Sequence, residues 1–326
     1  MNDSYAREIN YLRISVTDLC NLRCRYCMPE EGIDNKLGHK NVLSLEDYAR
    51  VVKVAARAGI RKVRLTGGEP LVRRNLVQLV RYIADIPEID DIAITTNGIL
   101  FPRFAREMKA AGLNRINISL DSLKEDRYAY ITRMGDLGQA KRAIFKALEM
   151  GLNPVKINTV VIKGFNDDEI VDFARMAHEY PLHIRFIEFM PIGDLRFWKK
   201  ERMMDADMIK GIVDKEFNLT VTRDIQGNGP ARYYQTEGGQ GSIGFISPMS
   251  NHFCAQCNRI RMTADGMLRG CLYEKRETDL KPALFSGDED EILRLIDQTI
   301  KRKPARHHMN EGWGRENERK MYQIGG

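Results

Sequence analysis

A regular alternation of strand-like and helix-like segments runs through the first two hundred residues and restricts this chain to a few folds. Short, mostly apolar segments typical of buried strands occur at 11–16, 62–65, 91–94, 115–120, 155–162 and 183–189. Helix-like segments follow them at about 44–58, 76–83, 104–111, 139–150, 167–179 and 206–216. Repeated strand–helix units with short loops predict an α/β fold, in which a parallel sheet is joined by right-handed crossovers.

The residues that follow these strands distinguish a barrel-like sheet from a doubly wound one. Cysteines lie in 20–27, a Gly-Gly-Glu-Pro turn at 67–70, and polar or unusual residues at 95–98, 119–122 and 188–191. All five segments fall at the carboxyl ends of strands, where parallel α/β barrels place their active sites. Six units are too few to close an eight-stranded barrel. We therefore predict an open, six-unit (β/α)6 partial TIM barrel.

The character of the sequence changes after about residue 220. Glycine and proline become frequent, and short alternating runs at 231–236 and 242–246 suggest antiparallel strands. A strand edge is expected at 269–272 and an amphipathic helix at 289–302. From Lys303 onward the chain is polar, and we expect this tail to lie on the surface or to be mobile. The predicted boundary divides the chain into residues 1–220 and 221–326.

The six cysteines fall into two groups of three. Cys20, Cys24 and Cys27 have the spacing C-x3-C-x2-C, which is too crowded for a disulfide and has no nearby fourth ligand for structural zinc. Thiolates also hold iron–sulfur clusters, and three of them leave one iron open to an outside ligand.

Cys254, Cys257 and Cys271 form the second group, with the spacing C-x2-C-x13-C. A zinc site with His252 as the fourth ligand and a second iron–sulfur cluster both remain open for this group.

The first cysteine group, with Tyr26 before its last cysteine, resembles the motif of the radical S-adenosylmethionine (SAM) family. In that family three cysteines bind a [4Fe–4S] cluster, SAM binds its fourth iron, and one electron cleaves SAM to methionine and a 5′-deoxyadenosyl radical. The turn at 67–70 is similar to the family's SAM-binding glycine motif, although such a turn alone is common. The resemblance implies SAM contacts from the following residues: Tyr26, Gly68, Glu69, Ser119 and Met190.

The second cysteine group, followed by 258–261 (Asn-Arg-Ile-Arg), resembles the molybdenum-cofactor branch of that family, the GTP 3′,8-cyclases, over nearly the whole chain. This resemblance implies a second [4Fe–4S] cluster that anchors guanine, and hydrogen abstraction from C3′ of GTP followed by attack on C8. It divides the chain into a radical SAM core and an auxiliary-cluster, substrate-binding region. It also implies that Gly325 and Gly326, at the end of the tail, enter the active site.

Cations carried by the predicted strands support a triphosphate substrate. Arg13, Arg64 and Lys156 each lie in or beside a strand, and arginine contacts phosphate oxygens bidentately. The alternative for any single one of them is an ordinary salt bridge. The resemblance adds Thr95, Arg259, Ile260 and Arg261 as GTP contacts. It makes Arg259, Arg261, Gly325 and Gly326 catalytic, whereas His307 and His308 are assigned no role.

Composition limits the partners. A net charge of +6 suits an anionic substrate, and the cations are spread along the core rather than gathered on one face, which argues against nucleic-acid binding. No apolar run reaches the ~20 residues that span a bilayer, and no signal peptide begins the chain, so the expected location is the cytoplasm. The resemblance further implies a reducing electron donor, transfer of the product to cyclic pyranopterin monophosphate synthase, and allows a homodimer. Rival functions are a peptide-modifying radical SAM enzyme and a non-catalytic iron–sulfur or zinc protein that binds nucleic acid.

Overall fold

The computed structural model describes residues 1–33, 37–38, 41–222, 229–309 and 319–325. Twelve strands of these residues form a single sheet in the order β12-β11-β10-β1-β2-β3-β4-β5-β6-β9-β8-β7. The strands are β1 (Tyr11–Ser15), β2 (Lys62–Thr66), β3 (Asp91–Thr96), β4 (Arg115–Ser119), β5 (Val155–Val161), β6 (Leu182–Glu188), β7 (Leu219–Thr222), β8 (Arg232–Thr236), β9 (Ser242–Ile246), β10 (Arg259–Met262), β11 (Met267–Arg269) and β12 (Thr278–Asp279).

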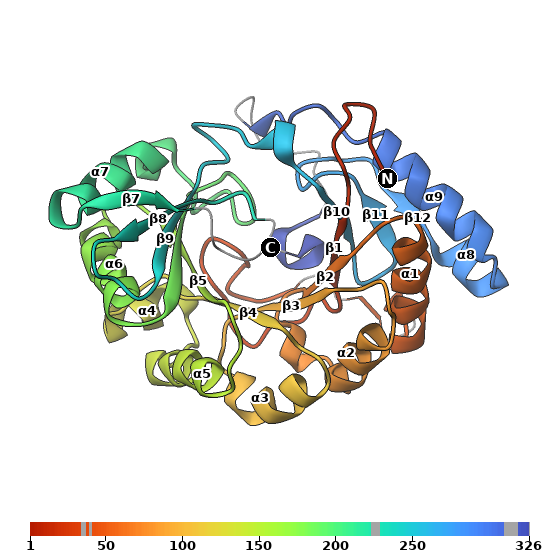
Figure 1. Cartoon of the computed structure of the whole chain (residues 1–326), viewed down its shortest axis with the longest axis horizontal. Helices are drawn as coiled ribbons and strands as arrows, with labels where there is room; N and C mark the ends of the chain where they lie inside the picture. Colours follow the sequence, from red (N-terminus) through yellow and green to blue (C-terminus); the bar gives the residue numbers. More distant parts are fainter. Residues whose placement is uncertain (34–36, 39–40, 223–228, 310–318, 326) are drawn as a thin grey trace.

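Helices cover the outer face of the curved sheet (Figure 1). They are α1 (Leu45–Arg57), α2 (Leu76–Ala84), α3 (Phe101–Ala110), α4 (Glu125–Thr132), α5 (Leu137–Glu149), α6 (Ile170–Glu179), α7 (Ala206–Glu216), α8 (Lys281–Ser286) and α9 (Glu289–Lys301). One further short helix, α10 (Met321–Ile324), lies inside the ring of strands, beside the C-terminus (Figure 1).

The structure confirms the predicted type of fold, an open partial α/β barrel. Strands β1 to β6 pair in parallel and in chain order, and each is followed by at least one helix. The described sheet is open, because β12 and β7 are its two unpaired edges. At the start of α1, Ser44 and Asp47 form a capping box, with Asp47 N donating to Ser44 Oγ over 3.0 Å.

Strands from beyond residue 220 extend the parallel part of the sheet at both ends. β10 pairs in parallel with β1, and β9 pairs in parallel with β6, so eight adjacent strands run parallel. The predicted antiparallel pairing of 242–246 is therefore correct for only one of its two neighbours. β9 pairs antiparallel with β8 and parallel with β6. An alternating run identifies a strand but not its partner. The division at residue 220 stays a prediction.

Alternation along each strand separates an apolar outer face from a polar inner one. On β1, Leu12 and Ile14 pack into the core under the helices, and on β2 Val63 and Leu65 do the same. The residues between them, including Arg13 and Arg64, line a cavity inside the barrel. A strand buried on both faces normally carries apolar side chains on both, so polar inner faces indicate that this barrel holds a polar ligand.

Part of the described tail is buried, which corrects for these residues the prediction that the tail lies on the surface. Lys303 is 3% exposed, because its ammonium group donates to Arg259 O over 2.9 Å and to Gly270 O over 2.6 Å. His307 is also buried, and its ring lies 4.4 Å from that of His252. Met309, Tyr322 and Ile324 are buried as well. The polar composition of this segment gives no sign of the burial. Its polar groups are buried through hydrogen bonds, and its buried apolar residues are isolated in the sequence.

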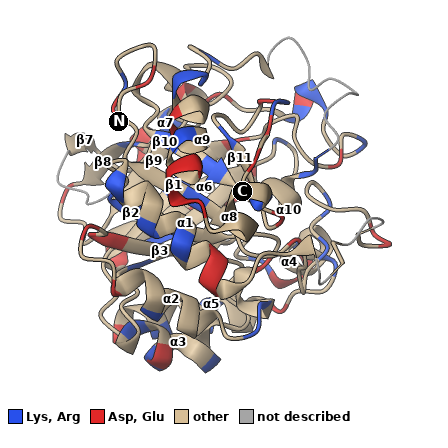
Figure 2. Ribbon diagram, turned by 90° about the vertical axis from the view of Figure 1, so that its right-hand side faces the viewer, with Lys and Arg blue, Asp and Glu red and all other residues tan. Residues whose placement is uncertain are grey.

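On the outside, acidic and basic residues are interspersed along the helices (Figure 2). Within the described residues, no helix combines the length and apolar character that crossing a bilayer requires.

Candidate functional site

The first cysteine group lies in the loop after β1. Cys20, Cys24 and Cys27 are free thiols, and Cys20 and Cys27 pack against the apolar side chains of Met28 and Tyr322. Burial raises the pKa of Cys20 to about 11 and that of Cys27 to about 12, and the charges of neighbouring acidic groups add to the rise. Burial also raises the pKa of Cys24, followed by the proximity of Cys27.

These thiols therefore form one electrostatically coupled set whose charges call for a cationic ligand. The described residues contain no His, Cys, Asp and Glu cluster arranged to hold a single metal ion. The donor chemistry nevertheless fits an iron–sulfur cluster, because such clusters bind to several cysteine thiolates, and binding would displace the thiol protons.

The glycine turn after β2 packs directly on the cysteine loop. A Cβ at Gly68 would collide with the main-chain oxygen of Leu19 and would lie 2.6 Å from that of Asp18. Gly67 has φ +152° and meets Thr17 O in the same way. Only glycine fits this contact, so the turn and the cysteine loop form one rigid wall.

Glu69 joins that wall to the end of β3. Its carboxylate accepts hydrogen bonds from Thr96 Oγ1 (2.7 Å), Asn97 N (2.7 Å) and Leu71 N (3.0 Å). Burial raises the pKa of Glu69 to about 7 although these bonds oppose the rise. The contact of Glu69 with SAM stays a prediction, since the structure shows it bound to protein groups.

The remaining predicted SAM residues lie at or after the carboxyl ends of parallel strands. Tyr26 donates from its hydroxyl to Asp121 Oδ2 over 2.7 Å, and its ring meets Phe189 edge-on at 6.5 Å. Ser119 ends β4, and Met190 follows β6 and lines the barrel cavity. Asp121, which also accepts from Val160 N over 2.9 Å, was not predicted as a site residue.

A cavity of about 170 Å³ inside the barrel brings the second cysteine group together with cationic side chains. Its walls include the three cysteines and five arginines, together with residues of the tail. The residues concerned are Cys254, Cys257, Cys271, Arg13, Arg64, Arg185, Arg259, Arg261, Lys303, His307, Met309 and Met321. The predicted arginines and the second cysteine group therefore converge on one space, although they come from both halves of the chain, whereas Lys156 does not line it.

The cations in this space repel one another. Burial lowers the pKa of Arg64 to about 10 and that of Arg261 to about 9, and other arginines contribute to both shifts. Lys156, on β5, has its pKa lowered to about 6 by burial, then by Arg185, Arg115 and Arg64. Buried like charges are costly unless an anion joins them, so this arrangement is that of an anion site.

Unsatisfied donors point to the same conclusion. The Nε atoms of Arg64 and Arg185 and the hydroxyl of Thr95 are buried without a hydrogen-bond partner among the described residues. Buried polar groups are normally paired, so orphaned donors beside a cavity favour a bound ligand. Arg115, by contrast, is already paired with Asp91. Arg185 was missed from the sequence, although its position two residues after His183 on β6 places both on one strand face.

Arg259 and Arg261 line the cavity beside the second cysteine group. Arg259 donates from Nη2 to Cys257 Sγ over 3.7 Å. Burial would raise the pKa of Cys257, but Arg259 and Lys303 lower it to about 6. Ile260 lies between the two arginines on β10, and its side chain faces the outer core. Any contact of Ile260 with GTP must therefore come from its main chain and stays a prediction.

Arg261 also donates from Nη1 to the carbonyl oxygen of Gly325, near Ser15 and Thr66 on the inner face of the barrel. The tail thus reaches the space between the two cysteine groups. The predicted role of Gly326 concerns a residue outside the described part of the chain.

Comparison with known proteins agrees with this site. Residues 14–177 match the radical SAM superfamily, and residues 182–309 match the family described as Molybdenum Cofactor Synthesis C. A GTP 3′,8-cyclase of Syntrophomonas wolfei is 66% identical, and one of Moorella thermoacetica is 53% identical, each over 100% of both chains.

Solved structures show the same fold at low identity. SuiB of Streptococcus suis bound to S-adenosylmethionine has a TM-score of 0.62 at 15% identity and covers 89% of this chain and 68% of its own. The protein anSMEcpe with bound AdoMet has a TM-score of 0.59 at 14% identity and covers 92% and 93%. The full-length matches to GTP 3′,8-cyclases set aside the non-catalytic zinc or nucleic-acid-binding alternative. This chain belongs to the radical SAM superfamily and, within it, to the family of the GTP 3′,8-cyclases.

Proposed function

We propose that this chain converts GTP to (8S)-3′,8-cyclo-7,8-dihydroguanosine 5′-triphosphate, the first step of molybdenum cofactor biosynthesis. The observation that carries the proposal is the barrel cavity, where buried, mutually repelling arginines face the second cysteine group. Such a space suits a small polyanion with a heterocyclic ring that could bind a metal cluster at the second cysteine group. The activity printed for relatives of 66% and 53% identity supports the same substrate.

Residues at the upper end of the barrel would hold the cofactors. Cys20, Cys24 and Cys27 would bind one [4Fe–4S] cluster, with SAM held by Tyr26, Gly68, Glu69, Ser119 and Met190. When bound, these two cofactors supply the 5′-deoxyadenosyl radical that removes hydrogen from C3′ of GTP. The chain itself would position the substrate and exclude water from it. The packed glycine turn and the buried part of the tail would keep water from the reacting carbon.

Different residues in and beside the cavity would bind different parts of GTP. Arg13, Arg64 and Arg185 line the cavity and would bind the triphosphate. Lys156, which lies within electrostatic range of Arg185 and Arg64, would join them, and Thr95 would offer its buried, unpaired hydroxyl.

The guanine end of GTP would face the second cysteine group. Cys254, Cys257 and Cys271 would hold a second [4Fe–4S] cluster that anchors guanine, and Arg259 and Arg261 would stabilise charge there as catalytic residues. Both arginines already face this end of the cavity.

Isotope transfer tests the proposal directly. The anaerobically reconstituted chain, given SAM, a strong reductant and GTP deuterated at C3′, should produce 5′-deoxyadenosine that contains deuterium, together with the cyclised nucleotide. ATP in place of GTP is the matched control and should yield no cyclised product. Unlabelled 5′-deoxyadenosine and no cyclised nucleotide would contradict the assignment of GTP as the substrate.

GTP binding is expected to take up a proton through Lys156. Its pKa of about 6 leaves the amine largely neutral at pH 7.5, and a nearby phosphate would raise that pKa and favour the charged form. Calorimetric binding enthalpies measured in buffers with different ionisation heats should reveal the uptake.

Lys156→Met should remove this proton uptake and weaken binding by roughly tenfold, which is about 1.4 kcal/mol. Lys109→Met, on the outer helix α3, is the control and should change neither quantity. The same buffer dependence in Lys156→Met as in the native chain would exclude Lys156 as the group that is protonated.

The proposed reaction requires partners that complete it. A reducing protein must supply the electron, and cyclic pyranopterin monophosphate synthase would accept the product. We also propose a cytoplasmic location, and that two copies can associate as a homodimer.

A further inference from the structure

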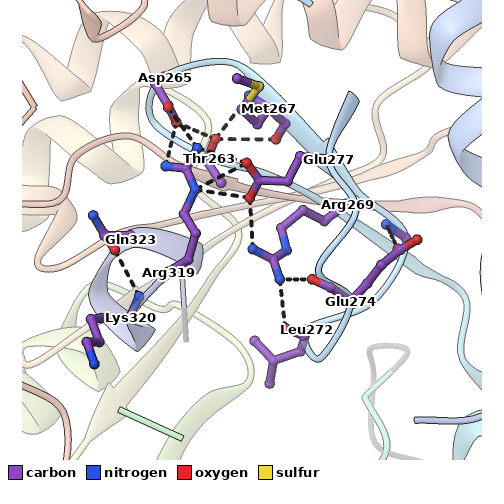
Figure 3. Close-up of polar contacts among 11 residues, drawn as sticks. Thr263, Asp265, Met267, Arg269, Leu272, Glu274, Glu277, Arg319, Lys320 and Gln323 are labelled. Atoms are coloured by element: carbon purple, nitrogen blue, oxygen red, sulfur yellow. Dashed lines mark hydrogen bonds and ion pairs between the residues drawn. The ribbon is translucent and has the colours of Figure 1, made fainter. Parts of the chain in front are cut away.

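The terminal segment is held in place by a forked ion pair at its first described residue, Arg319 (Figure 3). Nη1 and Nη2 of Arg319 donate to the two oxygens of Asp265 over 3.1 and 2.9 Å. Nε and Nη2 donate to Glu277 Oε1 and Oε2 over 3.0 and 2.9 Å. One guanidinium thus engages two carboxylates with nearly all of its donors, which is the geometry that gives arginine pairs their strength.

Each of the two carboxylates has a further hydrogen-bond donor besides Arg319. Asp265 lies in the turn between β10 and β11, where Thr263 Oγ1 donates to its Oδ1 over 2.6 Å. The three side chains are only 10 to 18% exposed, so water screens them little. Burial would raise the pKa of Asp265, but the hydrogen bonds from Arg319 and Thr263 lower it, and the carboxylate stays charged.

The chain beyond Arg319 is held mainly by the packing of a few side chains and by a hydrogen bond at Gly325. α10 has four residues, which is too short for a helix to be stable by itself. Tyr322 packs beside Cys20 and Cys27, and Ile324 packs against Ile192. Arg261 then meets Gly325 O. The ion pair of Arg319 is therefore the strongest polar anchor of a segment that touches the first cysteine group and the barrel cavity.

One of the two carboxylates is shared with the loop that carries Cys271. Glu277 Oε1 also accepts from Nη1 of Arg269 over 2.8 Å (Figure 3). Arg269 in turn donates to the main-chain oxygens of Leu272 and Glu274, one and three residues after Cys271. The carboxylate of Glu274 accepts from Gly270 N over 2.8 Å and closes this loop. Glu277 is thus the junction between the Cys271 loop and the tail.

We propose that Arg319 is a positioning residue that latches the terminal segment into the barrel, and that Glu277 couples this latch to the loop of the second cysteine group. When Cys271 binds its cluster, the loop is held and Glu277 is in place for Arg319. Without that ligand, the loop is freer, the latch weakens and the tail leaves the cavity. The inference rests on the proposed function, because it makes the radical step depend on a loaded second site.

Hydrogen exchange of the reconstituted full-length chain, without SAM or GTP, tests the latch without any turnover. Arg319→Ala should raise the exchange rate of the amides in 321–325 on the order of tenfold or more, because it removes the anchor and takes a cationic partner from Asp265 and Glu277. Arg319→Lys keeps the charge but cannot fork between two carboxylates, and should give a smaller increase. Arg294→Ala removes an exposed pair on α9 and is the control, which should leave the tail unchanged.

The coupling is tested at the other end of the network. Glu277→Gln and Cys271→Ala should each raise exchange in 321–325, although neither residue belongs to the tail. In the reconstituted enzyme, Arg319→Ala should still form 5′-deoxyadenosine but yield less cyclised product per molecule of SAM cleaved. Unchanged exchange in Arg319→Ala would overturn the latch. Increased exchange in Arg319→Ala but not in Cys271→Ala would overturn the coupling.

These readouts separate this inference from the proposed function. If the native chain failed to cyclise GTP, the proposed function would fail, whereas the exchange of the tail amides would still report on the latch.

Discussion

Replacing Cys24 with alanine is expected to abolish 5′-deoxyadenosine formation, with or without GTP. The first group offers three thiols, and Cys24 is electrostatically coupled to both of the others. A cluster that already leaves one iron to an outside ligand cannot lose a further thiolate and remain attached to the loop. We expect SAM cleavage to fall below roughly 1% of the native rate, because cluster binding and reactivity are lost together.

Cys257→Ala is the matched control for that result. It removes a thiol of the second group, beside Arg259, and leaves the loop after β1 untouched. This variant should still cleave SAM, but it should bind GTP more weakly and form no cyclised product. Iron analysis and product chromatography of both variants distinguish the two sites. Continued SAM cleavage by Cys24→Ala would show that the first cluster is assigned to the wrong residues, and normal cyclisation by Cys257→Ala would favour a structural metal.

The strands β1 to β6 could be predicted because each is a short apolar run closed by a turn. The capping box of Ser44 and Asp47 likewise marks the start of α1 in the sequence itself. α4 was not predicted, since its apolar periodicity is weak and no side chain caps it. The partners of β9 and β10 could not be read either, because parallel pairing between distant segments depends on the whole fold and leaves no local pattern.

The site divides in the same way. Cysteine spacing and the glycine turn are local features, so the sequence locates both. Arg185 and Asp121 become recognisable only when a cavity or a neighbouring tyrosine is seen beside them. Polar composition predicts that the tail lies on the surface or is mobile, and only the resemblance brings its last two glycines inside. The two carboxylates that anchor Arg319 lie more than 40 residues before it. Ion pairs between such distant positions have no signature in a single sequence.

Substituting Gly325 with alanine is expected to separate SAM cleavage from cyclisation. Gly325 has φ +79°, and a Cβ there would lie 2.6 Å from Thr66 Cγ2 and 3.5 Å from Ser15 Cβ. Thr66 is buried on β2, so its methyl group has little room to move and the end of the tail is expected to shift away from Arg261. A misplacement of about 1 Å can reduce turnover by roughly a hundredfold, and we expect an effect of that order on cyclisation. 5′-Deoxyadenosine should still form, since the first cysteine group is unchanged.

Gly287→Ala separates the steric effect from backbone strain. Gly287 has a similar φ of +75°, but nothing lies within 4 Å of the position of its Cβ. Both variants therefore carry the cost of a side chain at positive φ, about 1 kcal/mol, and only Gly325→Ala carries the collision. Removing residues 325 and 326 altogether should also stop cyclisation, and an added peptide ending in Gly-Gly should restore part of it, because the tail acts as a tethered ligand. Equal cyclisation by the Gly325 and Gly287 variants would mean that the buried end of the tail has no part in the reaction.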